Sequence, residues 1–100
     1  MAYYGGQVTL TATTTSIAGL LSITDTAKYK WKKVVVQAAQ ANAGLVYHGP
    51  STVTNVPVGA YGYIPQGGSW TFGQGDLYAA DIRQIYLDGT LNDIVFITLE

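Results

Sequence analysis

Short runs of alternating apolar and polar residues, separated by Gly, Pro and Asn, dominate the pattern along this chain. In residues 7–15, Val8 and Leu10 alternate with threonines. A period of two with many β-branched residues is typical of a half-buried strand. Similar β-rich runs at residues 34–36, 85–87 and 94–99 predict further strands. Together they predict an all-β fold, either an antiparallel β-sandwich or a jelly-roll-like barrel.

Turn-forming residues predict how these strands connect. Asn42-Ala43-Gly44 indicates a hairpin turn between a strand within residues 28–40 and a returning strand at 45–48. Asp88-Gly89 predicts a second tight turn, and the glycines of residues 66–69 a third. We expect a loop at residues 49–62, with short pairing at most near Val53 or Val56. We also expect one helical turn at 77–81, and a short strand or a packed turn at 17–21.

The length and the low charge indicate one domain with an interface. A chain of 100 residues suits a single β domain spanning residues 1–100, with residues 1–6 as a flexible N-terminal arm. Charged residues make up only 11% of the chain, against about 25% in ordinary domains. The eight Tyr and two Trp either fill a small β core or lie in an interface. We therefore expect a homo-oligomer.

Several classes of segment and site are not expected. There is no cysteine, so disulfides and thiolate metal sites are excluded. The first residues lack the basic and apolar regions of a secretory signal, and no apolar run approaches the roughly 20 residues of a membrane span. We expect a soluble protein made in a cytoplasm, with no membrane contact.

The residues that carry catalysis are sparse. His48 is the single histidine, the five aspartates are dispersed, and no serine lies in a Gly-x-Ser-x-Gly motif. One histidine without a second metal-binding partner is weak evidence for a metal or acid–base site. We expect His48 at a strand end or on the surface, and a protein that is not an enzyme and has no cofactor or metal.

A cluster of cations interleaved with aromatics is the one conspicuous surface feature. Lys28-Tyr29-Lys30-Trp31-Lys32-Lys33 holds four of the five cations. In an extended strand, Lys28, Lys30 and Lys32 share one face. The cluster could block unwanted pairing at a strand edge or dock on an acidic protein surface. Binding of single-stranded nucleic acid is the least favoured of the three interpretations. The chain as a whole lacks a nucleic-acid-binding signature. The candidate partner-binding residues are Lys28, Tyr29, Lys30, Trp31, Lys32, Lys33, Tyr3, Tyr4, Tyr61, Tyr63 and Trp70.

From residue 34 onward the order of motifs resembles a known group of proteins. The segments are Val34-Val35-Val36-Gln37, then Gly44-Leu45-Val46-Tyr47-His48-Gly49, Tyr63-Ile64-Pro65-Gln66-Gly67-Gly68-Ser69, Asp76-Leu77, Ile85-Tyr86-Leu87-Asp88-Gly89-Thr90 and Val95-Phe96-Ile97. This order resembles small β-sandwich virion structural proteins of tailed bacteriophages, of the head-decoration or head-fibre type. The likeness covers about two-thirds of the chain, and the first third has no counterpart.

The resemblance implies a structural role on a virus particle. The expected function is a capsid decoration (cement) protein that binds the major capsid protein or another virion protein on the capsid surface. By binding the assembled form preferentially, such a protein stabilises the shell. Three-fold symmetry is common on capsid lattices, so the resemblance favours a trimer as the homo-oligomer. The alternative is a carbohydrate-binding module associated with a tail or fibre, whose exposed aromatics stack on sugars. A cupin-like enzyme is disfavoured because there is only one histidine.

Overall fold

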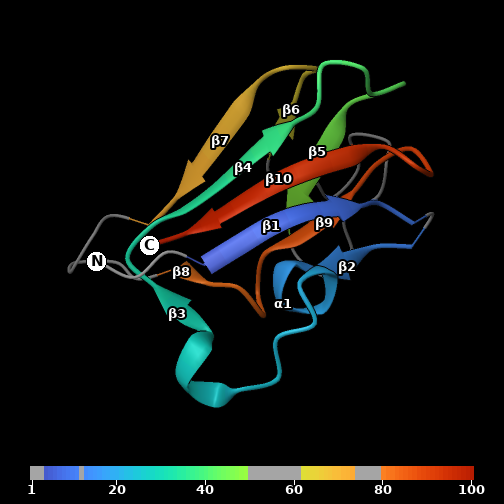
Figure 1. Cartoon of the computed structure of the whole chain (residues 1–100). Coiled ribbons are helices and arrows are strands. Elements are labelled where there is room, and N and C mark those ends of the chain that lie inside the picture. Colours follow the sequence, from blue (N-terminus) through green and yellow to red (C-terminus); the bar gives the residue numbers. More distant parts are fainter. Residues whose placement is uncertain (1–3, 12, 50–61, 74–79) are drawn as a thin grey trace.

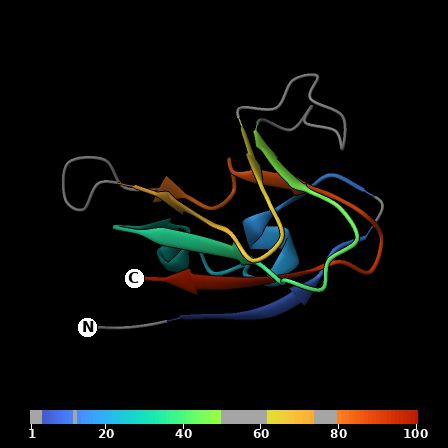
Figure 2. The ribbon, with the colours of Figure 1, turned by 90° about the horizontal axis from the view of Figure 1, so that it is seen from above.

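The computed structural model describes residues 4–11, 13–49, 62–73 and 80–100, and it is mostly β. Two four-stranded antiparallel sheets pack face to face in one compact unit (Figures 1 and 2). The first sheet has the order β1 (Tyr4–Thr9), β10 (Ile94–Leu99), β4 (Val34–Ala38) and β7 (Ser69–Phe72). The second has the order β2 (Thr15–Ser16), β9 (Tyr86–Asp88), β5 (Val46–Gly49) and β6 (Gly62–Ile64).

The pairing order is that of a jelly roll. Apart from a separate two-stranded ladder of β3 (Lys30–Trp31) and β8 (Ala80–Asp81), eight strands remain among the described residues. Counted along the chain, the first pairs with the eighth, the second with the seventh, the third with the sixth and the fourth with the fifth. A doubly folded ribbon of this kind gives the two sheets of a jelly roll. The expected antiparallel sandwich is therefore confirmed.

Side-chain alternation places the core between the sheets. Along β10, Val95, Ile97 and Leu99 are buried, whereas Phe96 and Thr98 are exposed. Their partners on β4 are the equally buried Ala38, Val36 and Val34. The second sheet adds Val46, Ile64 and Leu87 to the same core. Each such side chain contributes about 1.5–3 kcal/mol when it is fully buried.

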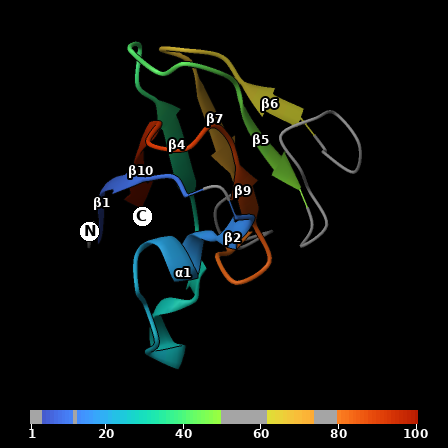
Figure 3. The ribbon, with the colours of Figure 1, turned by 90° about the vertical axis from the view of Figure 1, so that its right-hand side faces the viewer.

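A single helical turn adds to this core. Helix α1 (Ile17–Leu20) follows β2 directly, and the Ser16 hydroxyl caps it by accepting the Gly19 N–H at 3.1 Å. Ile17 and Ala18 are buried, and their N–H groups donate to the carbonyls of Ile85 and Ile82. The segment is thus a packed turn and not a strand, which resolves the two alternatives for residues 17–21. Figure 3 shows α1 beside β2, below the first sheet.

The expected hairpin between residues 28–40 and 45–48 is wrong. Strand β4 lies in the first sheet and β5 in the second, so the chain crosses the sandwich between them. The turn is anchored to the start of β10: the Asp93 carboxylate accepts the N–H groups of Ala43 and Gly44 at 2.8 and 3.0 Å. The Asn42 side chain exchanges two hydrogen bonds with the Ile94 backbone. These long-range bonds direct the chain to the other sheet.

Other local expectations also need correction. The tight turn expected at Asp88-Gly89 lies two residues later, where the Asp93 N–H donates to the Thr90 carbonyl, and it connects β9 and β10, which belong to different sheets. Residues 80–81, expected in a helical turn, form strand β8. Residues 4–6, expected in the flexible arm, pair with residues 97–99 in β1. Residues 94–99 form a strand as expected. The turn expected at residues 66–69 lies one residue earlier, at 65–68, because Ser69 begins β7. The loop at 50–61, including Val53 and Val56, lies outside the described residues.

Candidate functional site

The small β3–β8 ladder carries the basic cluster at one end of the sandwich. In this ladder Lys30 lies opposite Asp81, and Trp31 lies opposite Ala80. Figure 1 shows both strands at the end of the molecule where β10 finishes. A short 3-10 helix, η1 (Thr26–Lys28), leads into β3 and is capped by the Asp25 carboxylate, which accepts the Ala27 N–H at 3.0 Å.

The local backbone differs from the extended strand that the sequence predicted. Lys28 ends η1, the strand comprises only Lys30 and Trp31, and residues 32–33 separate β3 from β4. The expectation that Lys28, Lys30 and Lys32 alternate along one continuous strand is therefore wrong. Lys28 instead lies in a helical turn, Lys30 in a short strand, and Lys32 and Lys33 in the segment that joins β3 to β4. All four lysines are exposed.

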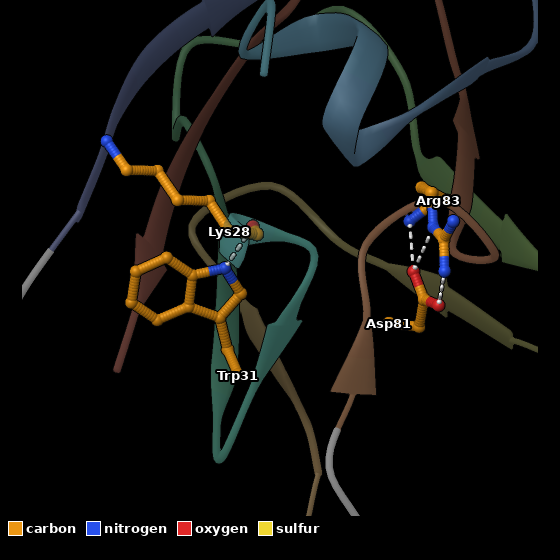
Figure 4. Close-up of polar contacts among 4 residues, drawn as sticks. All are labelled: Lys28, Trp31, Asp81 and Arg83. Atoms are coloured by element: carbon orange, nitrogen blue, oxygen red, sulfur yellow. Dashed lines mark hydrogen bonds and ion pairs between the residues drawn. The ribbon is translucent and has the colours of Figure 1, made fainter. Parts of the chain in front are cut away.

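The two aromatics of the cluster are held by hydrogen bonds to the chain itself. The Trp31 indole N–H donates to the Lys28 carbonyl at 2.7 Å (Figure 4). The Tyr29 hydroxyl donates to the Thr24 carbonyl at 3.1 Å. Both rings are half-buried and pack against the hydrophobic core. Tyr29 and Trp31 thus form a fixed base, and the four lysines near them in the sequence are exposed.

Arg83, which sequence reasoning did not include, completes the cluster. Its guanidinium binds the Asp81 carboxylate through two hydrogen bonds of 2.7 and 3.1 Å (Figure 4). Its Cζ lies 4.5 Å from the centre of the Tyr29 ring, within the range of a cation–π contact. The hydrogen bond from Arg83 lowers the pKa of Asp81 and outweighs the opposing effect of burial, and the same bond raises the pKa of Arg83.

All five cations of the chain therefore gather at one end. Lys33 forms an ion pair with Glu100 at 3.1 Å, and the two residues also pair through their backbones. Among the residues that the structure describes, this end holds five positive side chains against the three negative ones of Asp25, Asp81 and Glu100. Asp88 and Asp93 are buried, and Asp93 lies at the opposite end of β10. The charge of the described residues is thus polarised along the sandwich.

The remaining candidate aromatics do not share a face. Tyr63 is 54% exposed on the outer face of the second sheet, where it meets Tyr47 edge-to-face with ring centroids 6.3 Å apart. Trp70 projects from β7 toward the interior and contacts His48. Tyr4 lies in β1 opposite Leu99. Tyr3 and Tyr61 lie outside the described residues. Tyr63 and Trp70 therefore do not form one stacking platform.

His48 lies next to the last residue of β5, as expected for a strand-end position, but it is buried inside the sandwich, so the alternative of a surface position is wrong. It is 3% exposed, and its Nε2 has no hydrogen-bond partner. Its ring centroid lies 4.4 Å from that of Trp70 and 5.1 Å from that of Phe72. Gly62 lies beside it, and a Cβ at that position would come within 2.7 Å of Nε2. Burial among these groups lowers the pKa of His48.

The described acidic residues have structural roles. Asp93 holds the turn after β4, Asp88 accepts the N–H of Gly89 at 3.0 Å, and Asp81 binds Arg83. In the part of the chain that the structure describes, no three His, Cys, Asp or Glu side chains are grouped to hold a metal ion. None of the described helices has the length and apolar character needed to cross a membrane.

Comparisons with protein-family models, curated proteins and solved structures find no match to this chain. The candidate site therefore rests on its own geometry: a basic end built on two fixed aromatic rings, on the β3–β8 ladder of a jelly roll.

Proposed function

We propose that the protein is a structural component of a tailed-phage particle that docks through its basic end on an acidic surface of the assembled capsid. One observation carries the docking part of this proposal: all five cations are exposed and lie at the end of the sandwich that holds η1, β3 and β8. The phage assignment rests on the motif resemblance from residue 34 onward. Jelly rolls are common in viral capsid and lectin domains, which is compatible with this role but does not by itself indicate it.

The geometry of the basic end suits recognition more than edge protection alone. Lysines placed only to block a sheet edge need no ordered surroundings. Here Tyr29 and Trp31 are hydrogen-bonded and packed, and Arg83 joins the cluster from more than fifty residues along the chain. A preorganised set of exposed cations raises the association rate with a complementary surface and fixes its orientation.

The carbohydrate-binding alternative has weaker support. Sugar stacking needs exposed aromatic faces on one surface. Tyr63 lies on the outer face of the second sheet, whereas Trp70 lies on the inner face of the first sheet. The Trp70 ring also packs on His48, which covers part of it. We therefore propose protein docking alone, and glycan binding by the isolated protein would be evidence against this assignment.

Cosedimentation with capsid shells tests the proposal. The shells are assembled from the major capsid protein of the same genome, and the variant replaces Lys28, Lys30 and Lys32 by Ser. We expect the wild type to cosediment and the triple variant to bind at least about tenfold more weakly, since several interfacial charges are lost. The control is Gln40→Ser, an exposed position beyond the end of β4 that lies away from the basic cluster. Equal binding of the triple variant and the wild type would exclude the basic end as the docking site.

A further inference from the structure

Strand β1 is a six-residue strand at the edge of the first sheet. It pairs with β10 along its whole length, and no other strand in the described part of the chain pairs with it. The bond from Ala39 N–H to the Ile94 carbonyl shows that Ile94 faces β4, so Val95 and Ile97 face β1. Backbone groups alternate in direction along an antiparallel strand. Gly5, Gln7 and Thr9 therefore direct their N–H and C=O groups away from β10.

This edge lacks the features that keep sheet edges apart. Natural edges are protected by charge, proline or short length. The other edge strands of the two sheets have two to four residues, and β3 carries a lysine. Strand β1 has the sequence Tyr-Gly-Gly-Gln-Val-Thr, with no charge and no proline. Gly5, Gly6, Gln7 and Thr9 are exposed.

We propose that β1 pairs antiparallel with β1 of a second copy, which joins the two first sheets into one continuous eight-stranded sheet. A two-fold axis at Gln7 places Gln7 opposite the partner's Gln7 and Gly5 opposite the partner's Thr9. Because these residues direct their backbone groups outward, each such pair can exchange two N–H···O bonds. This inference goes beyond the proposed capsid docking and does not depend on it.

Shape and charge both favour a second copy as the occupant. The same register places Val8, which is half-buried, opposite the partner's Gly6. A Cβ added to Gly6 would meet nothing within 4 Å, so the valine has open space to enter. On the outer face the neighbouring side chains are Phe96, Thr98 and Gln37, all uncharged. Two identical surfaces without charge approach without repulsion, and an isologous contact of this kind closes as a dimer.

The expected dimer is reversible and two-fold. A strand-to-strand contact buries less than the roughly 800 Å² per partner of a standard interface, so the dimer population should rise with protein concentration. Self-pairing of β1 gives dimers and not the trimers suggested by capsid symmetry. The mass of the oligomer in solution therefore separates the two arrangements.

Sedimentation equilibrium of two matched lysine variants tests the proposal. Gln7→Lys places like charges opposite each other at the two-fold axis, which opposes strand pairing. Thr71→Lys adds the same charge at an exposed outer-face position of β7, the opposite edge. We expect reversible dimers for the wild type and Thr71→Lys, and monomers for Gln7→Lys. A wild type that is monomeric throughout, or an oligomer that survives in Gln7→Lys, would overturn the proposal.

Cysteine cross-linking gives a readout that does not depend on disrupting the strand. The chain contains no cysteine, so a single introduced thiol can form a disulfide only with the same thiol of a second molecule. Opposed residues of a hydrogen-bonded pair have Cα atoms about 5.5 Å apart, within the range that a disulfide spans. Under mild oxidation, Gln7→Cys should form a covalent dimer quickly and Thr71→Cys should not. Equal or faster cross-linking of Thr71→Cys, or no cross-linking of Gln7→Cys, would also overturn it.

Discussion

His48 of β5 and Trp70 of β7 join the two sheets of the sandwich, with ring centroids 4.4 Å apart and ring planes tilted by 50°. Strands β5 and β7 belong to different sheets, so this contact is a direct side-chain link across the interior. Phe72 adds a second ring at 5.1 Å from His48. The neutral imidazole suits this apolar site, and an imidazolium would lose its hydration there without gaining a hydrogen-bond partner at Nε2.

Acidification should therefore destabilise the fold through His48. Because burial lowers its pKa in the folded state, the unfolded chain binds more protons below the ordinary histidine pKa of 6.5. The stabilising contribution is complete above that pH, and it is lost as the pH falls from 6.5 toward the lower pKa of the folded protein. Urea unfolding between about pH 8 and about pH 5.5 should show a falling midpoint.

The control for this prediction is His48→Phe. Phenylalanine keeps an aromatic ring beside Trp70 and Phe72 but cannot be protonated. The chain has no other histidine, so the midpoint of the variant should be nearly constant in this pH window. An identical decline in the variant and the wild type would show that another group is responsible.

Gly62→Ala should destabilise the protein by roughly 1–3 kcal/mol, as overpacking of a filled site does. The added Cβ would come within 2.7 Å of His48 Nε2 and 3.2 Å of the Trp70 ring, so these rings must move. A double-mutant cycle with His48→Ala isolates the contact. Gly62→Ala should cost much less when His48 is already alanine. Equal costs in both backgrounds would mean that the strain lies in the backbone of β6.

Removal of the Asp93 carboxylate should weaken the crossing between the sheets. Asp93→Ala leaves the N–H groups of Ala43 and Gly44 without their acceptor, at a cost of about 2–3 kcal/mol in the free energy of unfolding. Asp93→Asn keeps one carbonyl oxygen and should cost less. Chemical denaturation measures both. If the two variants were as stable as the wild type, the turn would not depend on this anchor.

Individual strands were predictable from the sequence because their signals are local. The β-branched run at residues 94–99 predicted the last strand with its correct ends. The connections were not predictable, because Asn42-Ala43-Gly44 and Asp88-Gly89 look like hairpin turns. Which strands these turns connect depends on long-range hydrogen bonds, such as the one from the Gly44 N–H to the Asp93 carboxylate, forty-nine residues away.

The candidate site was predictable only in part for the same reason. The four lysines are adjacent in the sequence, and so they were found. Arg83 reaches Tyr29 only because Ala80–Asp81 pairs with Lys30–Trp31. Residues 77–81 carry no strand pattern that would indicate this pairing. His48 lies in a short strand ending in glycine, and nothing nearby signals that rings from β7 enclose it.

A cryo-electron microscopy map of capsid shells with the protein bound tests the central claim most directly. The account predicts density on the outside of the shell, with the η1–β3–β8 end turned toward it and Lys28, Lys30 and Lys32 facing acidic side chains of the capsid protein. Density with this end directed into solvent, or shells that carry none of the protein at saturating concentration, would contradict the account.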